Sequence, residues 1–359
     1  MPTLFDPVTI GDLHLKNRIL MAPMTRGRAT RDNVPTPLMA EYYAQRASAG
    51  LILSEGTGIS RESLGWPRAP GIWTGEQTKA WRPITKAVHD RGGLIFCQLW
   101  HMGRLVHPDY LDGAPPVSAS ATCGPGEAHT YDGKKPYASA RALRIDEIPR
   151  VVAEYRRAAA NAMDAGFDGV QLHAANGYLI DQFLRDGTNL RDDAYGGSIG
   201  NRLRLLIEVT KAIISAAGPK RTSVRLSPND HLKGCIDSDL ATLFPAAAKA
   251  LSDLDIALLE MRIARGDGDY YTGQAVGDQV PAMRRAFNGV LALNSTYTPA
   301  EADGMLSRGE ADAFSFGRRF LANPDLPHRF RHGAELNAVN LTTIYAPDAT
   351  GYTDYPALE

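Results

Sequence analysis

The chain has 359 residues, with 39 Lys and Arg residues against 40 Asp and Glu residues, and a formal net charge of -1. This balance gives no electrostatic reason to expect binding to nucleic acid or to an anionic membrane. Hydrophobic residues make up 44% of the chain, which argues against disorder and is sufficient for a large buried core.

The sequence also bears on the compartment. No uncharged apolar run approaches the ~18 residues of a membrane span, and the N-terminus has Asp6 and Asp12 where a signal peptide would be basic and apolar. The cysteines, Cys97, Cys123 and Cys235, are far apart, which excludes an iron–sulfur or zinc centre held by cysteine alone. We therefore expect a soluble cytoplasmic protein.

Short apolar runs alternate with helical patterns along the chain. Several are nearly continuous in Val, Ile and Leu, which is typical of parallel strands buried on both faces. The expected strands are residues 18–22, 51–54, 94–99, 169–172, 223–226, 257–260, 289–293 and 313–316. Eight strands alternating with helices predict a (β/α)8 TIM barrel. An open doubly wound sheet is the alternative, but no Gly-x-Gly-x-x-Gly follows the first strand.

One of the expected helices illustrates the pattern. Ile148, Val152, Tyr155 and Met163 fall on one helical face, and Gly166 is placed to end the helix.

The connection after the third strand is unusually long. Residues 103–143 are rich in Gly, Pro, Ser and Thr, and loops of this length usually have a functional role. We expect them to form a subdomain that caps the barrel mouth, within a single domain that spans residues 1–359.

Arg225, inside the fifth expected strand, is the strongest single indication of a site. Burying an unpaired guanidinium is unfavourable, so this group needs an anion or strong acceptors. Two interpretations have about equal weight on physical grounds. One is a structural salt bridge with Glu260, at the end of the next strand. The other is contact with an electron-poor cofactor whose reduced form carries negative charge.

A second group follows the fourth strand, at the end where barrels place their chemistry. His173 and Asn176 could donate hydrogen bonds to one oxygen, and Tyr178 could deliver a proton to a nearby carbon. His173 and His101 could instead be metal ligands, but no carboxylate or third His has metal-ligand spacing with them. We interpret the cluster as catalytic and expect no metal.

Strands seven and eight of such barrels often bind phosphate through backbone N–H groups. Ser295, Thr296, Gly317 and Arg318 occupy these positions, and Arg318 could pair with phosphate charge. The alternative is that Arg318 is a solvated side chain and Gly317 a turn residue.

Three further residues are candidates for the same site. The amide of Gln98 could form hydrogen bonds with the edge of a planar heterocycle, although a Gln in an apolar strand is more often a structural residue with hydrogen bonds inside the protein. Trp66 and Trp100 could line an aromatic pocket, although packing in the core is the commoner role of Trp.

These features occur together in one known family. The chain resembles, from end to end, the Old Yellow Enzyme family of FMN-dependent ene-reductases. Matching segments include Met21-Ala22-Pro23-Met24-Thr25-Arg26, Gln98-Leu99-Trp100-His101-Met102-Gly103-Arg104, His173-Ala174-Ala175-Asn176-Gly177-Tyr178, Tyr195-Gly196-Gly197-Ser198, Phe316-Gly317-Arg318 and Gly351-Tyr352-Thr353-Asp354-Tyr355-Pro356. The combination of these motifs is highly specific.

The resemblance implies non-covalent FMN at the C-terminal mouth of the barrel, reduced by NADPH or NADH. The implied cofactor residues are Pro23, Met24, Thr25, Gly56, Gln98, Arg225 and Tyr345, with Ser295, Thr296, Gly317 and Arg318 at the phosphate. His173 and Asn176 would hold the carbonyl or nitro oxygen of an activated alkene, and Trp66 and Trp100 would line its pocket. Hydride would go to the β-carbon, and Tyr178 would protonate the α-carbon.

Other functions remain as alternatives. They are a non-catalytic flavin-binding or redox-sensing protein and a flavoenzyme that reduces nitro or nitrate-ester compounds. A cofactor-free lyase or aldolase would need a Lys at a strand end, and none of the eight ends has one. The residues 229–236 and 263–274 match the family poorly, so the substrate preference does not follow from the resemblance. The choice between NADPH and NADH and the oligomeric state also stay open.

Overall fold

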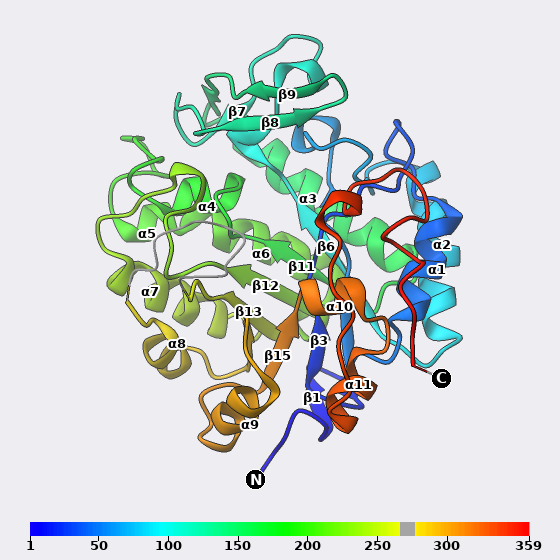
Figure 1. The fold of residues 1–359 in the computed structure, drawn as a ribbon. Coiled ribbons are helices and arrows are strands. Elements are labelled where there is room, and N and C mark those ends of the chain that lie inside the picture. Colours follow the sequence, from blue (N-terminus) through cyan, green and yellow to red (C-terminus); the bar gives the residue numbers. More distant parts are fainter. Residues whose placement is uncertain (266–276, 359) are drawn as a thin grey trace.

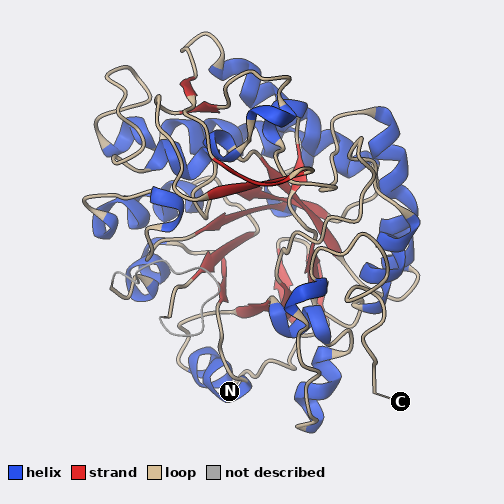
Figure 2. Ribbon diagram, turned by 45° about the horizontal axis from the view of Figure 1, so that its top comes forward, coloured by secondary structure: helices blue, strands red, loops and turns tan. Residues whose placement is uncertain are grey.

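The computed structural model describes residues 1–265 and 277–358. Its centre is a closed barrel of parallel strands (Figures 1 and 2). In chain order the barrel strands are β3 (Ile19–Met21), β4 (Leu51–Leu53), β6 (Ile95–Trp100), β11 (Gly169–His173), β12 (Thr222–Leu226), β13 (Leu258–Arg262), β14 (Val290–Asn294) and β15 (Ala313–Phe316). Each strand pairs with the next, and β15 pairs with β3 to close the ring. The predicted (β/α)8 barrel is thus confirmed.

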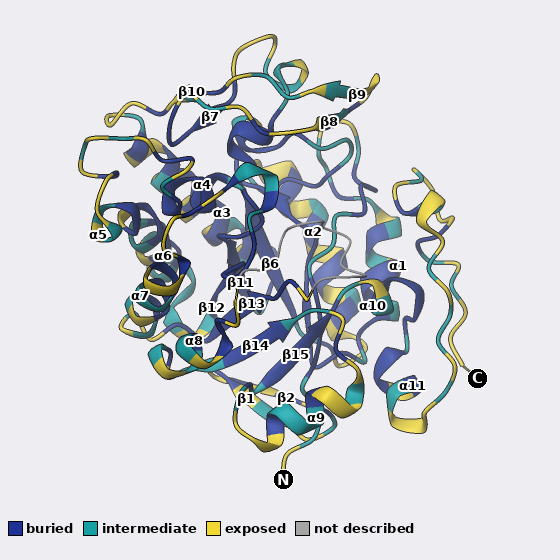
Figure 3. Ribbon diagram, turned by 60° about the vertical axis from the view of Figure 1, so that its left-hand side comes forward, coloured by how far each residue is buried: buried dark blue, intermediate teal, exposed yellow. Residues whose placement is uncertain are grey.

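Helices surround the barrel, as Figure 2 shows. They are α1 (Pro37–Gln45), α2 (Gly75–His89), α3 (Ile148–Asp164), α4 (Leu179–Leu184), α5 (Ile199–Arg202), α6 (Arg204–Ala217), α7 (Leu240–Ser252), α8 (Val280–Ala286), α9 (Pro299–Ser307), α10 (Arg318–Ala322) and α11 (Leu326–His332). Every residue of β11, β12 and β13 is buried (Figure 3), as expected for strands covered on both faces. Within the described part of the chain, no helix is long and apolar enough to cross a membrane.

Helix α3 shows how sequence sets a buried face. Its buried residues are Ile148, Val151, Glu154, Tyr155, Ala158, Ala159 and Ala162. The prediction that Ile148 and Tyr155 face the core is confirmed, whereas Val152 and Met163 are only half-buried. Small alanines complete the face, and a pattern built on large apolar residues overlooks them. The helix ends just before Gly166, whose φ of 86° is the left-handed conformation typical of a helix stop.

A short hairpin closes the N-terminal end of the barrel. It consists of the antiparallel strands β1 (Val8–Ile10) and β2 (Leu13–Leu15). Its apolar side chains join a buried cluster with residues of the barrel strands, namely Leu20, Leu51, Leu53, Phe96, Leu258, Ala292 and Ala313. This end is filled with side chains, so the opposite end of the barrel is left for a site.

Residues 103–143 contain the short strands β7 (Val117–Ser118), β8 (Glu127–Thr130), β9 (Gly133–Pro136) and β10 (Arg141–Ala142). The antiparallel β8–β9 hairpin projects at the top of Figure 1. Its His129 ring lies 4.3 Å from the ring of Trp66. The capping role of this insertion stays a prediction.

Candidate active site

A cavity of about 590 Å³ lies at the C-terminal ends of the barrel strands. All of the cofactor and substrate residues predicted from the sequence line it: Pro23, Met24, Thr25, Gly56, Trp66, Gln98, Trp100, His173, Asn176, Tyr178, Arg225, Ser295, Thr296, Gly317, Arg318 and Tyr345. The barrel topology explains this convergence, because it gathers the ends of distant strands at one mouth. The volume is in the range of small-molecule and cofactor sites.

Two hydrogen-bond donors converge on one side of this cavity. His173 ends β11, and Asn176 follows three residues later; both are buried. The backbone N–H of Ala175 is directed at His173 Nδ1, 3.4 Å away, so we assign the ring proton to Nε2. Nε2 lies 3.5 Å from the amide nitrogen of Asn176. With this assignment, two N–H donors lie side by side, an arrangement that can bind one oxygen acceptor.

The imidazole of His173 is neutral at this site. Burial, reinforced by the nearby Arg225 guanidinium, lowers the pKa of His173 well below its ordinary value. The oxygen site therefore consists of two neutral donors, which suits an uncharged carbonyl or nitro oxygen.

Because His173 is neutral, we predict that the affinity for a carbonyl ligand does not change with pH. We expect the dissociation constant of the FMN-loaded, oxidised protein for 2-cyclohexenone to stay constant as the pH falls through 6.5, because burial lowers the pKa of His173 well below this ordinary value. The change in the flavin absorption spectrum as 2-cyclohexenone is added measures this dissociation constant. Binding that tightens as the pH falls through 6.5 would contradict the assignment.

Tyr178 stands beside these donors. Its ring meets that of His173 edge-on, with centroids 4.9 Å apart, and that of Trp100 in the same manner at 5.0 Å. Tyr178 is half-buried and is the N-cap residue of α4. Its phenol is therefore held next to the oxygen site, within the same cavity.

Gly56 allows Trp100 to lie close to the chain. A Cβ at position 56 would fall 2.6 Å from the Trp100 ring, closer than atoms can approach. Because Trp100 is almost completely buried, it has little room to move. The glycine after β4 therefore shapes the cavity wall through this aromatic ring.

Gly56→Ala is expected to lower the free energy of unfolding by about 1–3 kcal/mol, the usual effect of overpacking. Urea unfolding measures it. Gly75→Ala, in α2, is the matched control, because a Cβ there would meet nothing within 4 Å; it should leave stability unchanged or slightly increased. Equal stabilities of the two variants would contradict the predicted clash.

Arg225 takes part in a polar network at the base of the cavity. Its Nη1 lies 2.9 Å from Glu260 Oε1, and its Nη2 donates to Asn294 Oδ1 at 2.7 Å. Glu260 is completely buried and also accepts from Gln171, whose side-chain oxygen accepts from Gln98 at 2.8 Å. The two interpretations of Arg225 are thus compatible: it forms the ion pair, and it lines the cavity.

A buried carboxylate positions the loop after β3. Glu55 Oε2 accepts the backbone N–H groups of Arg26 and Gly27 at 3.0 and 3.1 Å. Burial raises the pKa of Glu55, although these hydrogen bonds oppose that shift. This contact joins the ends of β3 and β4 and fixes the half-buried segment 23–25 in the cavity wall.

The cavity wall near α10 consists of a glycine backbone and an exposed arginine. Gly317 is the N-cap residue of α10, and the exposed Arg318 follows it. A Cβ on Gly317 would make only ordinary contacts, the nearest with Met24 Sδ at 3.5 Å. Protein packing does not require glycine there, which fits the close approach of a ligand to this backbone. The hydroxyl of Ser295 already donates to Ile263 O at 2.7 Å.

Several lining residues escaped the sequence-based prediction. Arg262 ends β13 and is buried in the wall, and the same rule that singled out Arg225 would have found it. A segment near the C-terminus contributes Leu336, Asn337, Val339, Leu341 and Ile344. No local pattern marks these residues, because their place depends on distant contacts.

His101, the other histidine considered as a metal ligand, is completely buried. Its Nδ1 accepts the backbone N–H of Gly103 at 3.1 Å, and burial lowers its pKa to about 3. In residues 1–265 and 277–358, no three His, Cys, Asp or Glu side chains are grouped so as to hold a metal ion.

The wall fits FMN in its donor set. In the part of the chain that the structure describes, two buried donors of lining residues have no hydrogen-bond partner: Arg225 Nε and Trp100 Nε1. Unpaired buried polar atoms are rare in folded proteins, and a polar ligand satisfies them. Arginines at the base and at α10 suit the heterocycle and the phosphate of this cofactor.

Comparisons with known proteins agree with this geometry. A family profile described as "NADH:flavin oxidoreductase / NADH oxidase family" matches residues 3–337. The putative 12-oxophytodienoate reductase 4 of Oryza sativa subsp. japonica is 41% identical over 363 residues, which cover 99% of this chain and 93% of that protein.

Solved structures give the same result. The Old Yellow Enzyme homologue from Zymomonas mobilis superposes with a TM-score of 0.97 at 58% identity, over 99% of this chain and 100% of that one. Morphinone reductase in complex with tetrahydroNAD gives a TM-score of 0.93 at 43% identity, over 100% and 98% of the chains. The chain therefore belongs to the Old Yellow Enzyme family, and it is an FMN-dependent oxidoreductase that uses NADH or NADPH and acts on carbon–carbon double bonds.

Proposed function

We propose that this enzyme reduces alkenes that are activated by a conjugated carbonyl or nitro group. The observation that carries the proposal is the pair of neutral donors, His173 Nε2 and Asn176 Nδ2, 3.5 Å apart beside the phenol of Tyr178. Such a pair can bind one oxygen through two hydrogen bonds, and it stabilises the negative charge that develops on that oxygen.

FMN would supply the redox chemistry of the reaction, which is hydride transfer from a reduced nicotinamide to the β-carbon of the alkene. The residues that we assign to its ring are Pro23, Met24, Thr25, Gly56, Gln98, Arg225 and Tyr345. Of these, Arg225 and Gln98 belong to the buried polar network, so their donors are fixed in direction. A fixed donor set binds a heterocyclic edge without having to reorganise.

We assign the phosphate of the cofactor to Ser295, Thr296, Gly317 and Arg318. The Ser295 hydroxyl is already engaged with a backbone carbonyl, so its contribution would come from its N–H group. Arg318 is exposed at the start of α10 and would supply the charge.

Tyr178 would donate the proton to the α-carbon. The acid has to lie close to a substrate whose oxygen is fixed, and Tyr178 packs against His173, one of the groups that fixes it. Trp66 and Trp100, which line the same cavity, would hold the body of the substrate against the flavin.

The visible spectrum of the purified protein tests this proposal. We expect a flavin spectrum that bleaches with NADPH under nitrogen and recovers when 2-cyclohexenone is added. Bleaching without recovery would keep the cofactor and reject activated alkenes as substrates. Recovery with nitro or nitrate-ester compounds alone would favour that class instead.

A further inference from the structure

The loop that carries the oxygen-binding amide has an unusual backbone. Asn176 has a φ of 60° and Gly177 a φ of 78°, so two consecutive residues adopt left-handed conformations. A non-glycine residue adopts this conformation infrequently, although Asn tolerates it better than most. Surrounding contacts must therefore hold Asn176 in the orientation that points its amide at the cavity.

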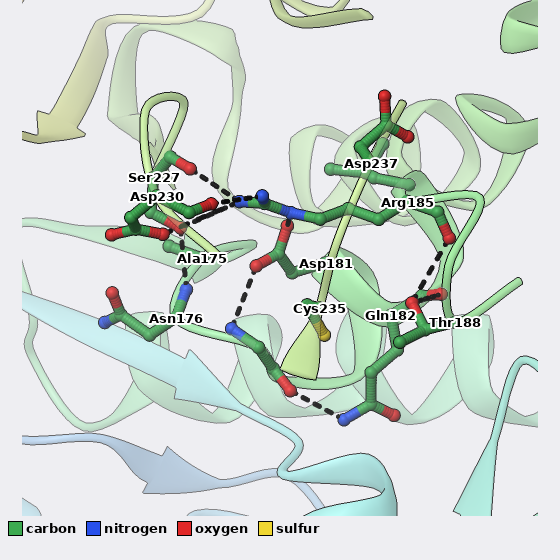
Figure 4. A network of polar contacts seen from close by, with 12 residues as sticks. Ala175, Asn176, Asp181, Gln182, Arg185, Thr188, Ser227, Asp230, Cys235 and Asp237 are labelled. Atoms are coloured by element: carbon green, nitrogen blue, oxygen red, sulfur yellow. Dashed lines mark hydrogen bonds and ion pairs between the residues drawn. The ribbon is translucent and has the colours of Figure 1, made fainter. Parts of the chain in front are cut away.

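Three polar contacts fix the backbone of this loop, as Figure 4 shows. The N–H of Asn176 donates to Ser227 Oγ at 2.9 Å, and the N–H of Gly177 donates to Asp181 Oδ2 at 2.9 Å. The carbonyl of Gly177 accepts from Gln182 Nε2 at 2.8 Å. Asp181 and Gln182 lie in α4, which follows the loop directly, so the helix reaches back to hold the turn before it.

One buried arginine connects two of these anchors. Arg185 is completely buried, and its Nε donates to Asp181 Oδ1 at 2.7 Å. Its Nη2 donates to Ser227 O at 2.6 Å, and its Nη1 donates to the backbone carbonyl of Asp230 (Figure 4). The planar guanidinium thereby sets the distance between the helix and the loop after β12 that carries Ser227.

Neither Asp181 nor Arg185 is among the residues that line the cavity. A buried ion pair is by itself weak evidence of stabilisation, because desolvation offsets the attraction. Here every described hydrogen bond of the Asp181 carboxylate goes either to the loop or to Arg185. One carboxylate oxygen therefore binds the loop at Gly177, and the other binds Arg185, which in turn binds the backbone of Ser227.

We propose that Asp181 and Arg185 are positioning residues, which fix the left-handed turn at Asn176 and so aim its amide at the substrate oxygen. The inference rests on the proposed function, in which Asn176 binds that oxygen. Asp181 acts on Gly177 directly and on Ser227 through Arg185. The pair therefore controls affinity for the oxygen ligand without touching it.

The test measures ligand binding apart from turnover. The FMN-loaded, oxidised enzyme is titrated with 2-cyclohexenone, and the perturbation of the flavin spectrum gives the dissociation constant. Asp181→Asn should raise it about 10-fold or more, and Ser227→Ala, which leaves no buried charge unpaired, about 3-fold, from the usual strength of the hydrogen bonds lost. The dissociation constant for FMN, followed by flavin fluorescence, should change by less than about 2-fold, because neither residue lines the cavity.

A matched control separates positioning from general loss of stability. Asp325 and Arg329 form the same i,i+4 pair at 2.8 Å at the start of α11, and Arg329 also donates to backbone carbonyls. Asp325→Asn should lower Tm and leave the constant for 2-cyclohexenone unchanged. Should Asp181→Asn fold poorly, Ser227→Ala still tests the anchoring of the loop on which the inference depends, because it removes only the hydroxyl that holds Asn176 N–H, and wild-type affinity would overturn the inference.

Asn176→Ala, measured in parallel, distinguishes the two proposals. If Asn176→Ala weakens binding while Ser227→Ala and Asp181→Asn bind as the wild type does, the positioning inference is overturned and the oxygen site stands. If Asn176→Ala itself binds normally, the oxygen site is wrong, and the positioning inference falls with it.

Discussion

Replacing Arg225 with methionine is expected to lower the free energy of unfolding of the FMN-free protein by about 3–5 kcal/mol. The substitution leaves the Glu260 carboxylate completely buried without the guanidinium that lies 2.9 Å from it. Gln171 still donates to Glu260, but a neutral donor does not balance a buried charge. Urea unfolding, analysed as a two-state transition, measures the loss.

The double variant Arg225→Met/Glu260→Gln separates stability from cofactor binding. Without the buried charge, most of the lost stability should return, because an amide at 260 can still bond to Gln171. The affinity for FMN should stay about 10- to 100-fold weaker in both variants, from the loss of charged hydrogen bonds to the heterocycle. Fluorescence titration with FMN measures it. Full recovery of FMN affinity in the double variant would show that Arg225 serves only the ion pair.

Much of the lining of the cavity was predictable because two simple regularities meet in this fold. Apolar runs mark the strands, and a barrel brings the ends of all its strands to one mouth, so residues as distant as Thr25 and Arg318 can be placed together without coordinates. Arg225 was informative because a charged residue inside an apolar run needs a partner, and Glu260 sits opposite it in the neighbouring strand.

The wall near the C-terminus could not be predicted in the same way. The segment around Ile344 is held by arginines from the other end of the chain: Arg26 and Arg28 donate to its carbonyl, and Arg28 also donates to Thr350 O. Backbone carbonyls carry no sequence signal, so such anchoring is invisible before the chain is folded. The contacts that hold the turn at Asn176 could not be predicted either, because in the sequence Asp181 and Arg185 look like ordinary residues of a helix.

Tyr178→Phe is expected to reduce the turnover of activated alkenes by about 100-fold or more, the usual contribution of a positioned general acid. Bleaching of the flavin absorption by NADPH should be unaffected, and so should FMN content, because the phenol is assigned to the alkene step alone. Stopped-flow absorbance under nitrogen follows bleaching and recovery separately.

Tyr155→Phe supplies the control for loss of a tyrosine hydroxyl. Tyr155 is buried in α3, and its hydroxyl has no partner among the described residues, so its removal should change neither step. The ring of Tyr178 packs edge-on against His173 and Trp100, and phenylalanine retains those contacts. A defect confined to recovery of the flavin spectrum therefore reports on the missing proton donor and not on the shape of the cavity. Normal recovery with several alkenes would instead require the proton to come from another group or from water.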